Sequence, residues 1–289
     1  MNILITGANG QLGNELRQLA PKYPHHTFWM TDVQELDITD AGTVGNFIRD
    51  NKIDVTINCA AFTAVDRAES EPELCHRLNA EAPRLLAEAM QAVGGYLVQI
   101  STDYVFDGTS HLPYSEDAPT CPRSVYGTTK LEGEQAVMEA CPASVIVRTA
   151  WLYSTFGNNF VKTMLRLGSE RDNLGVIFDQ IGTPTYAADL AAAVLQIVDK
   201  GAVPGIYHYS NEGVCSWYDF TKEIHRLAEI TSCDVRPLHT AEYPTPAPRP
   251  AYSVLDKTKI KQTYGIRIPW WQESLAECVS KLLNKQLAE

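Results

Sequence analysis

Tyr126 and Lys130 lie four residues apart, a spacing that places two side chains on the same face of a helix. A lysine ammonium beside a phenol favours the phenolate, so we expect Lys130 to lower the pKa of Tyr126 from the ordinary value of ~10 toward the working pH. A phenol tuned in this way can donate its proton to a carbonyl oxygen while hydride reaches the carbon. The pair therefore indicates a hydride-transfer enzyme with Tyr126 as its proton donor.

A second pair, Tyr218 and Lys222, has the same spacing, so the surrounding sequence must decide between them. Only the first pair follows an apolar run that ends in hydroxyl groups, at Ser101 and Thr102. Ligands of open α/β sheets bind at the carboxyl ends of strands, where a hydroxyl can hold a substrate carbonyl. We interpret Tyr218 and Lys222 as ordinary helix packing and Thr102 as part of the site.

Three glycines, Gly7, Gly10 and Gly13, follow the first apolar run and open a helical pattern, which is the context of a dinucleotide-binding loop. Their spacing differs by one residue from the G-x-G-x-x-G form, so a structural turn stays an alternative. Asp32 follows Gly13 by about 20 residues, where a carboxylate binds the adenosine ribose. No arginine adjoins Asp32, and a carboxylate repels a 2′-phosphate, which favours NADH over NADPH.

Two shorter motifs admit two interpretations each. Asp37 and Ile38 could border an adenine pocket, or the segment could be a helix start capped by Thr39 or Asp40. The segment 60–63 contains small residues that allow a cofactor to approach the backbone closely, but the sterics of a turn would explain them equally well.

Short apolar runs alternate with helical patterns in the first half of the chain, as in a parallel sheet covered by helices. We therefore predict an α/β fold: a Rossmann-type, doubly wound parallel sheet in residues 1–150 and a smaller C-terminal substrate-binding region in residues 151–289. The boundary is approximate, and the two parts can interleave. The expected strands are Asn2–Thr6, Thr27–Thr31, Val55–Cys59, Tyr96–Ser101 and Ser144–Arg148, and the clearest helices are Glu73–Val93, Trp217–Ile230 and Trp271–Asn284.

The segment Tyr243–Pro250 contains four prolines, which remove the backbone donors that a helix or a central strand needs. It must be a loop, and a loop this stiff presents Arg249 at little entropic cost. A plain linker with a solvated arginine is the alternative.

Composition restricts the class of protein further. A net charge of −11 with no basic stripe argues against nucleic acid as a partner, although an anionic small molecule could still bind locally. The N-terminus lacks a basic leader and no apolar run approaches the ~20 residues of a membrane span, so we expect no membrane partner and a cytoplasmic location. Seven cysteines without a Cys-x-x-Cys spacing indicate thiols and not a disulfide framework or a zinc site.

Longer motifs carry a resemblance to a known family. They include Gly10-Gln-Leu-Gly13, Ser101-Thr-Asp-Tyr-Val-Phe-Asp-Gly108, Tyr126-Gly-Thr-Thr-Lys130-Leu-Glu-Gly-Glu134, Arg148-Thr-Ala-Trp151-Leu-Tyr153, Gly157-Asn-Asn-Phe160, Gly182-Thr-Pro-Thr185 and the proline loop. Almost end to end, the chain resembles the extended short-chain dehydrogenases/reductases, and among them the dTDP-4-dehydrorhamnose reductase family. The resemblance implies reduction of the C4 keto group of a nucleotide sugar, dTDP-4-dehydro-β-L-rhamnose, by NADPH or NADH, for rhamnose-containing surface polysaccharide.

The resemblance also implies residue roles. Thr102 would hold the sugar carbonyl, Tyr126 would protonate it, and Lys130 would bind the nicotinamide ribose. The implied substrate contacts are Thr102, Asp103, Tyr126, Trp151, Asn159 and Arg249, of which the last two would lie toward the diphosphate. The expected cofactor contacts are Gly7, Gly10, Gln11, Leu12, Gly13, Asp32, Asp37, Ile38, Ala61, Phe62, Thr63, Tyr126 and Lys130.

Two comparisons refine this reading. Related dehydratases carry a glutamate where this chain has Tyr104, which cannot act as their base at neutral pH, so elimination is not expected. Some family members resemble metal-linked dimers built on glutamates; Glu15 matches one of these, but the later position reads Ala188-Asp189. We therefore expect no metal, and a monomer or weak homodimer.

Two other functions remain open. One is a non-catalytic binding module like the regulatory subunit of methionine adenosyltransferase, and the other is a reductase of a different nucleotide sugar. The intact set of Thr102, Tyr126 and Lys130 argues against the first.

Overall fold

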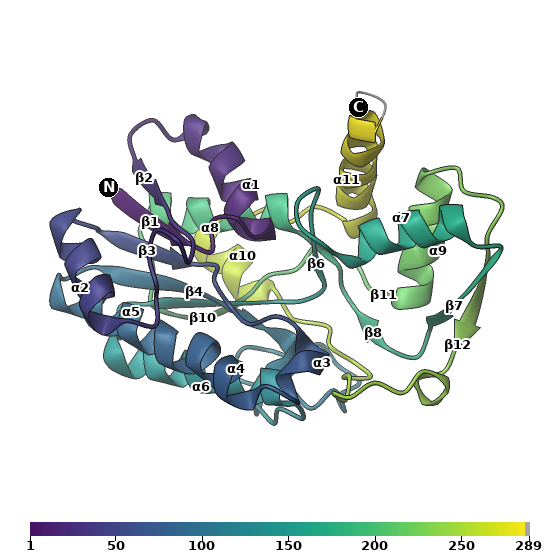
Figure 1. The fold of residues 1–289 in the computed structure, drawn as a ribbon, viewed down its shortest axis with the longest axis horizontal. Coiled ribbons are helices and arrows are strands. Elements are labelled where there is room, and N and C mark those ends of the chain that lie inside the picture. Colours follow the sequence, from purple (N-terminus) through teal and green to yellow (C-terminus); the bar gives the residue numbers. More distant parts are fainter. Residues whose placement is uncertain (287–289) are drawn as a thin grey trace.

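A six-stranded parallel sheet with the order β10-β5-β4-β3-β1-β2 forms the centre of the protein (Figure 1). The computed structural model describes residues 1–286. All five expected strands are present, with ends within one residue of those expected, and the α/β fold is confirmed. The strands are β1 (Asn2–Thr6), β2 (Thr27–Met30), β3 (Val55–Asn58), β4 (Tyr96–Thr102), β5 (Val145–Thr149) and β10 (Gly205–His208).

Burial along the strands follows their place in the sheet. Every residue of β3 and β5 is buried, as expected for central strands covered on both faces. In β2, at the edge, exposed and half-buried residues alternate. The apolar runs in the sequence therefore marked the interior strands correctly.

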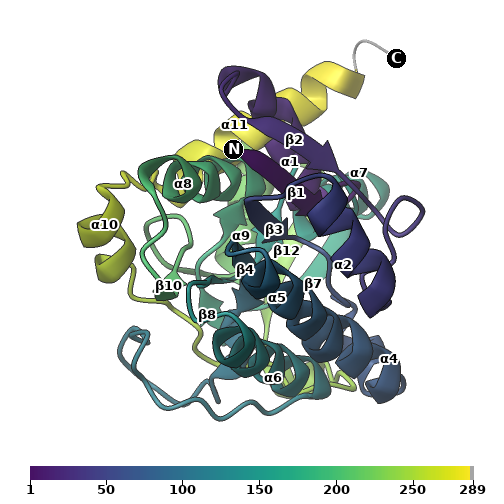
Figure 2. The ribbon, with the colours of Figure 1, turned by 90° about the vertical axis from the view of Figure 1, so that its left-hand side faces the viewer.

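Helices cover both faces of this sheet (Figure 2). Core residues of α1, α8 and α10 pack on one face, and those of α2, α5 and α6 pack on the other. The helices are α1 (Gln11–Leu19), α2 (Ala41–Asp50), α3 (Val65–Ala68), α4 (Pro72–His76), α5 (Ala82–Ala92), α6 (Val125–Ala140), α7 (Phe160–Glu170), α8 (Ala187–Lys200), α9 (Trp217–Leu227), α10 (Thr258–Tyr264) and α11 (Trp271–Gln286).

The helix expected over Glu73–Val93 is interrupted in the structure. It consists of α4 and α5 joined by a π-helical turn, Arg77–Glu81, in which the chain takes one extra residue per turn. Such turns often mark functional sites, and this one contains a buried asparagine described below.

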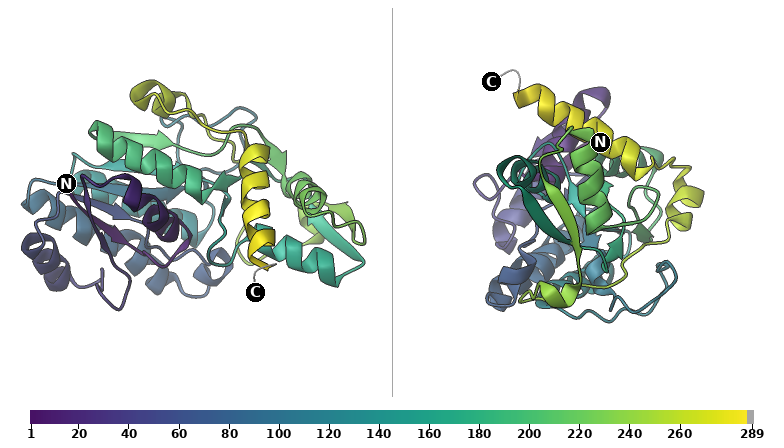
Figure 3. Two further views of the ribbon diagram at one scale, coloured as in Figure 1. Left: turned by 90° about the horizontal axis from the view of Figure 1, so that it is seen from above. Right: turned by 90° about the vertical axis from the view of Figure 1, so that its right-hand side faces the viewer.

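A second core lies beside the sheet and joins α7, α9 and α11 (Figure 3). The helices expected near residues 217–230 and 271–284 are confirmed as α9 and α11. Ser216 caps α9 through a reciprocal pair of bonds with Asp219. The short strands of this region and the connections to it are β6 (Leu152–Tyr153), β7 (Asn173–Ile177), β8 (Ile181–Gly182), β9 (Thr185–Tyr186), β11 (Cys215–Ser216) and β12 (Asp234–Leu238).

The chain passes between the two regions more than once. After residue 150 it returns to the main sheet to add α8 and β10, which the sequence did not reveal. The division near residue 150 stays a prediction. The segment Tyr243–Pro250 contains neither helix nor strand, as its prolines predicted.

All seven cysteines are free thiols. Within residues 1–286, no helix combines the length and the apolar character that a membrane crossing demands.

Candidate active site

The predicted site residues gather at the carboxyl edge of the main sheet. β1 pairs with β2 on one side and with β3 on the other, so the order of strands reverses at β1. A reversal of this kind opens a crevice outside the strand ends, which is where open α/β sheets bind ligands. The loops that leave β1, β2, β3 and β4 all reach this edge.

The glycines of the loop after β1 let its backbone pack closely against neighbouring backbone. Gly7 has a left-handed φ of +62°, and a Cβ there would lie 2.7 Å from the backbone nitrogen of Ala60. A Cβ on Gly13 would lie 2.4 Å from the Gly7 carbonyl oxygen. Gly10 precedes the first residue of α1, and in the described part of the chain this helix start has no side-chain cap. This helix start fits a pyrophosphate, because free N–H groups and the helix dipole favour an anion.

Asp32 lies next to this loop, at the end of β2. Its carboxylate accepts hydrogen bonds from the backbone N–H groups of Asn9, at 3.0 Å, and Val33, at 2.8 Å. The structure therefore brings the expected ribose-binding carboxylate against the glycine loop. Its role with the cofactor stays a prediction.

The following segment is a turn that leads into α2. Asp37 accepts bonds from the backbone and hydroxyl of Thr39, and Asp40 caps α2 by accepting from the Thr43 N–H at 2.6 Å. The helix cap considered for this segment is thus observed at Asp40. Ile38 is buried in the sheet-facing core, and a contact of Asp37 or Ile38 with adenine stays a prediction.

Asn79, which the sequence analysis missed, holds the loop that follows β3. This buried side chain accepts from the Phe62 N–H at 2.8 Å and donates to the Phe62 carbonyl at 3.0 Å. It fixes the backbone between Ala61 and Thr63, beside the glycine loop. Asn79 lies within an apolar helical pattern. The only signal of its role in the sequence was a polar amide on the helix face that was expected to be buried.

Tyr126 lies in the first turn of α6, opposite the end of β4. Ser124 caps this helix by accepting from the Gly127 N–H at 3.1 Å. A Cβ on Gly127 would lie 2.3 Å from the Tyr104 carbonyl oxygen, so the helix start packs directly on the turn after β4. Burial raises the pKa of Tyr126, and the nearby Thr102 hydroxyl opposes the rise. Tyr126 and Thr102 therefore lie close together, as the expected chemistry requires.

Lys130 is almost fully buried and donates to the Ile100 carbonyl at 2.6 Å. Burial lowers the pKa of Lys130 to about 8, and the nearby Glu134 carboxylate opposes this shift. The expected lowering of the Tyr126 pKa by Lys130 is not observed, because the loss of solvent around the phenol dominates and raises it.

A buried ion pair between Glu134 and Arg148 lies close to Lys130. Glu134 and Arg148 are each 2% exposed and form bonds of 2.7 to 3.2 Å, while Ser101 donates to the same carboxylate. The pair ties α6 to the ends of β4 and β5. Sequence spacing did not reveal it, because the three residues come from three different elements.

Asp103, next to Thr102, offers an unused acceptor. One carboxylate oxygen accepts from the Thr102 hydroxyl at 3.0 Å, and within the described residues the other is buried without a hydrogen-bond partner. Burial raises the pKa of Asp103 to about 6, and the nearby Ser253 and Thr102 hydroxyls oppose the rise. A ligand hydroxyl would satisfy this oxygen.

Trp151 takes an unusual backbone conformation, with a φ of +48°. Its ring stacks on Trp217, with centroids 3.5 Å apart and planes 9° from parallel. Gly182 lies against the Trp151 indole, where a Cβ would come within 2.7 Å. The two indoles join the strand end after β5 to the start of α9.

The two remaining predicted substrate residues lie in different places. Asn159 caps α7 and donates to Gln11 at 3.1 Å, which places it at the glycine loop. Arg249 donates to Asp66 at 2.8 Å. Its positive charge also partly opposes the rise in the Tyr104 pKa that burial causes. The Tyr104 ring packs edge-on against Tyr126, with centroids 5.4 Å apart, so the proline loop reaches the neighbourhood of Tyr126.

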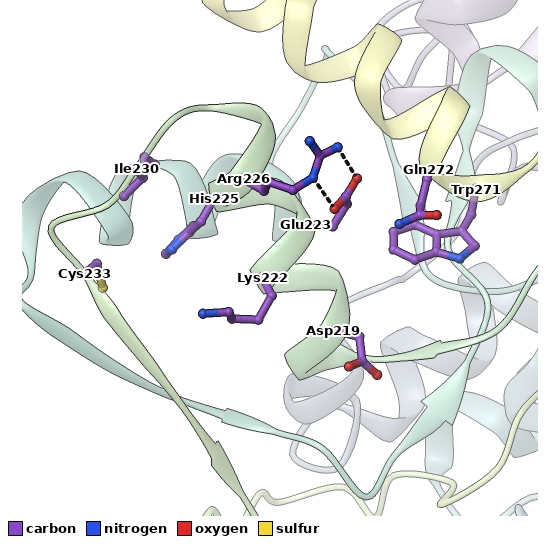
Figure 4. Close-up of a pocket in the computed structure, with 9 residues that line it drawn as sticks. All are labelled: Asp219, Lys222, Glu223, His225, Arg226, Ile230, Cys233, Trp271 and Gln272. Carbon is purple, nitrogen blue, oxygen red and sulfur yellow. Dashed lines mark hydrogen bonds and ion pairs between the residues drawn. The ribbon is translucent and has the colours of Figure 1, made fainter.

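The second Tyr-Lys pair lies elsewhere, on α9. Tyr218 packs against the second core, and Lys222 lines a pocket of about 420 Å³ between α9, the start of α11 and Cys233 (Figure 4). In this pocket Arg226 is held by Glu223 at 2.7 Å. No strand of the main sheet ends there within the described residues; Tyr218 has the expected packing role, whereas Lys222 is exposed.

The carboxylates considered for a metal-linked dimer have protein partners. Ser154 donates to Glu15 at 2.6 Å. Asp189 accepts from Asn211 at 2.7 Å and from Ser274 at 2.5 Å. Both are held inside the chain by neighbouring polar groups.

Comparisons with known proteins agree with this geometry. The family model described as RmlD substrate binding domain matches residues 1–284. A dTDP-4-dehydrorhamnose reductase from Aggregatibacter actinomycetemcomitans is 43% identical, covering 94% of this chain and 96% of its own length. A crystal structure of a dTDP-4-dehydrorhamnose reductase from Clostridium acetobutylicum is 49% identical with a TM-score of 0.94, covering 98% of this chain and 100% of that one. A crystal structure of a dTDP-4-dehydrorhamnose reductase from Bacillus anthracis in complex with NADP is 41% identical with a TM-score of 0.93, covering 97% of this chain and 99% of that one. The chain therefore belongs to the RmlD substrate binding domain family, among relatives that are dTDP-4-dehydrorhamnose reductases.

Proposed function

We propose that this protein uses NADPH or NADH to reduce the C4 keto group of dTDP-4-dehydro-β-L-rhamnose, giving dTDP-L-rhamnose. The observation that carries the proposal is the nearness of Tyr126 and Thr102 at the sheet edge that also carries the glycine loop, in a chain of this family. A nucleotide-sugar substrate, a cytoplasmic location, a place in surface polysaccharide synthesis and a monomeric or weakly dimeric state belong to the same proposal.

The glycine loop and the uncapped start of α1 would hold the pyrophosphate, and Asp32 would bind the adenosine ribose. The relative from Bacillus anthracis was solved with NADP, which supports a dinucleotide in this crevice. When bound, the reduced nicotinamide supplies the hydride.

Tyr126 would donate the proton. Its raised pKa keeps the phenol protonated at neutral pH, which is the form that a reduction consumes. Thr102 would hold the carbonyl oxygen next to the phenol. Lys130 has three N–H donors, of which one bonds Ile100, so the others can bind the nicotinamide ribose.

The substrate contacts are proposed on the same basis. The unpartnered oxygen of Asp103 would accept from a sugar hydroxyl, and the Trp151 indole would form a wall of the sugar pocket. Asn159 and Arg249 would lie toward the diphosphate, one at the glycine loop and the other at the proline loop.

Tyr104 argues against elimination chemistry. Burial raises its pKa, so the phenol stays protonated and cannot remove a proton from a sugar carbon. Reduction of a ketone needs no base at this position.

The test is oxidation of NADPH and NADH, followed by absorbance, with dTDP-4-dehydro-L-rhamnose generated in place. Rapid oxidation with formation of dTDP-L-rhamnose supports the proposal. A folded protein that binds a dinucleotide but oxidises neither would disprove this substrate. Turnover of another dTDP-4-keto sugar would then indicate a different reductase, and co-purification with a methionine adenosyltransferase would indicate the binding module.

The pH dependence of kcat/KM should be bell-shaped, with limbs near pH 6 and pH 8. Above about pH 8, Lys130 loses the proton that gives it its charge, since burial lowers its pKa. Below about pH 6, Asp103 gains a proton and loses an acceptor, since burial raises its pKa. Rates at saturating cofactor from pH 5 to 9.5 would show this profile. Asp103→Asn should remove the acidic limb alone, and an unchanged limb would contradict the assignment.

Asp32→Asn should shift the cofactor preference toward NADPH by about tenfold, because it removes a charge that repels the 2′-phosphate while keeping one acceptor for the loop. The measurement is the ratio of kcat/KM for NADPH to that for NADH. Asp50→Asn, an exposed carboxylate at the end of α2, is the control and should leave the ratio unchanged. An equal ratio in wild type and Asp32→Asn would place the adenosine ribose elsewhere.

A further inference from the structure

Two consecutive histidines and an aspartate meet at the edge of the main sheet that lies opposite the candidate active site. His25 and His26 directly precede β2, and Asp199 lies in the last turn of α8. The view in Figure 2 faces this end of the molecule, where β2, α1 and α8 lie side by side. His25 and Asp199 are 174 residues apart in the chain, so only the fold brings them together.

The two imidazoles converge on one carboxylate oxygen. Nε2 of His25 lies 2.7 Å from Oδ1 of Asp199, and Nε2 of His26 lies 3.3 Å from the same oxygen. One donor atom from each residue lies within 4.8 Å of the others, the only group of this kind found in residues 1–286. The imidazole rings themselves are 4.1 Å apart.

His26 is the reason to look for a ligand here. Its side chain is only 4% exposed, and its Nε2 is buried without a hydrogen bond despite the nearby carboxylate. A buried polar atom of this kind costs free energy unless something satisfies it. The ring cannot easily turn away, because Tyr23 stacks on one side and Phe28 meets it edge-on.

The opposite edge of the His26 ring has a polar neighbour. The Met1 amino group lies 3.3 Å from Nδ1, so Nε2 is the nitrogen that faces His25 and Asp199. Burial and the neighbouring His25 lower the pKa of His26, and Asp199 only partly opposes the shift, so the neutral imidazole that can bind a cation is favoured.

We propose that His25, His26 and Asp199 form a binding site for a divalent transition-metal ion of the Zn²⁺ class. Two imidazoles with one carboxylate suit Zn²⁺, Co²⁺ or Ni²⁺ better than Mg²⁺ or Ca²⁺, which prefer oxygen ligands alone. Bonds of about 2.0–2.2 Å place neighbouring ligands of a tetrahedral ion about 3.3–3.6 Å apart. The distance from His26 to Asp199, 3.3 Å, already matches, and His25 and Asp199, at 2.7 Å, must separate slightly.

That adjustment is feasible because His25 and Asp199 are 57% and 42% exposed and face solvent. Water would complete the coordination from the same side. The bound ion would join the start of β2 to the end of α8, two segments on the edge and face of the sheet, and would stabilise the folded chain against unfolding.

The experiment uses the full chain without a histidine tag, first treated with a chelator. Zn²⁺ is titrated by calorimetry, Co²⁺ by its visible absorption, and the thermal midpoint is measured with and without Zn²⁺. We expect one ion per chain, a cobalt spectrum of nitrogen and oxygen ligation, and a midpoint raised by about 3–8 °C. His26→Gln and Asp199→Asn should each weaken binding by at least about tenfold.

His239→Gln is the matched control. His239 forms an exposed pair with Asp179 at 3.4 Å but has no second imidazole beside it, so this variant should bind Zn²⁺ like the wild type. Stoichiometric binding that survives in His26→Gln, binding lost equally in His239→Gln, or no binding by the wild type would each overturn the proposal.

Discussion

Replacing Tyr126 with phenylalanine should lower kcat by a factor of about 10²–10⁴, the usual contribution of a positioned proton donor. The phenol lies near Thr102 and stays protonated at neutral pH, so its loss removes the proton that the reduction consumes. The affinity for NADPH should change little, because the glycine loop and Asp32 remain. Steady-state rates and a cofactor titration by fluorescence would measure both quantities.

The second Tyr-Lys pair supplies the control for this experiment. Tyr218→Phe removes the same hydroxyl from a residue with the same spacing, in a helix that packs against the second core. It should retain wild-type kcat. Near-normal turnover by Tyr126→Phe would show that another group donates the proton, and a large loss in Tyr218→Phe would reverse our choice between the pairs.

Replacing Glu134 with glutamine should destabilise the fold by about 3–5 kcal/mol, because it leaves the Arg148 guanidinium buried without a counter-charge. The pKa of Lys130 should also fall further, because the Glu134 carboxylate is the main group that holds it up. The alkaline limb of the pH profile should therefore move to lower pH. A purely structural role for Glu134 would change stability without moving this limb.

Glu88→Gln is the matched control for stability. Glu88 pairs with Arg84 on the surface of α5, with both side chains about half exposed. Loss of such a pair costs about 0–1 kcal/mol. Urea unfolding followed by circular dichroism would compare the two variants, and equal midpoints would contradict the importance that we assign to the buried pair.

The sequence predicted well what depends on local pattern. Gly7 and Gly13 could be identified because a strand, a tight turn and a helix are consecutive in the chain, and the structure shows a Cβ at either position in contact with backbone. The five early strands were visible as apolar runs between helical patterns. Tyr126 was preferred to Tyr218 because its helix follows a strand that ends in hydroxyl groups, and its role as proton donor stays a prediction.

Features that depend on distant contacts were missed. β10 is only four residues long, and its place in the sheet depends on pairing with β5. Asn79 gains its role from backbone groups 17 residues away. The pKa of Tyr126 was expected to fall because spacing showed a lysine nearby, but spacing does not show burial, and burial decided the direction.

The stacked indoles of Trp151 and Trp217 give the protein an optical label of its own. Two indoles with centroids 3.5 Å apart couple their electronic transitions, and where these transitions are twisted relative to one another the pair produces a paired signal in circular dichroism that isolated indoles lack. Trp151 holds its ring there with a left-handed backbone that few residues other than glycine adopt. A ligand that enters between β5 and α9 and opens the stack would change this signal. Circular dichroism can therefore follow such binding without a dye and without turnover.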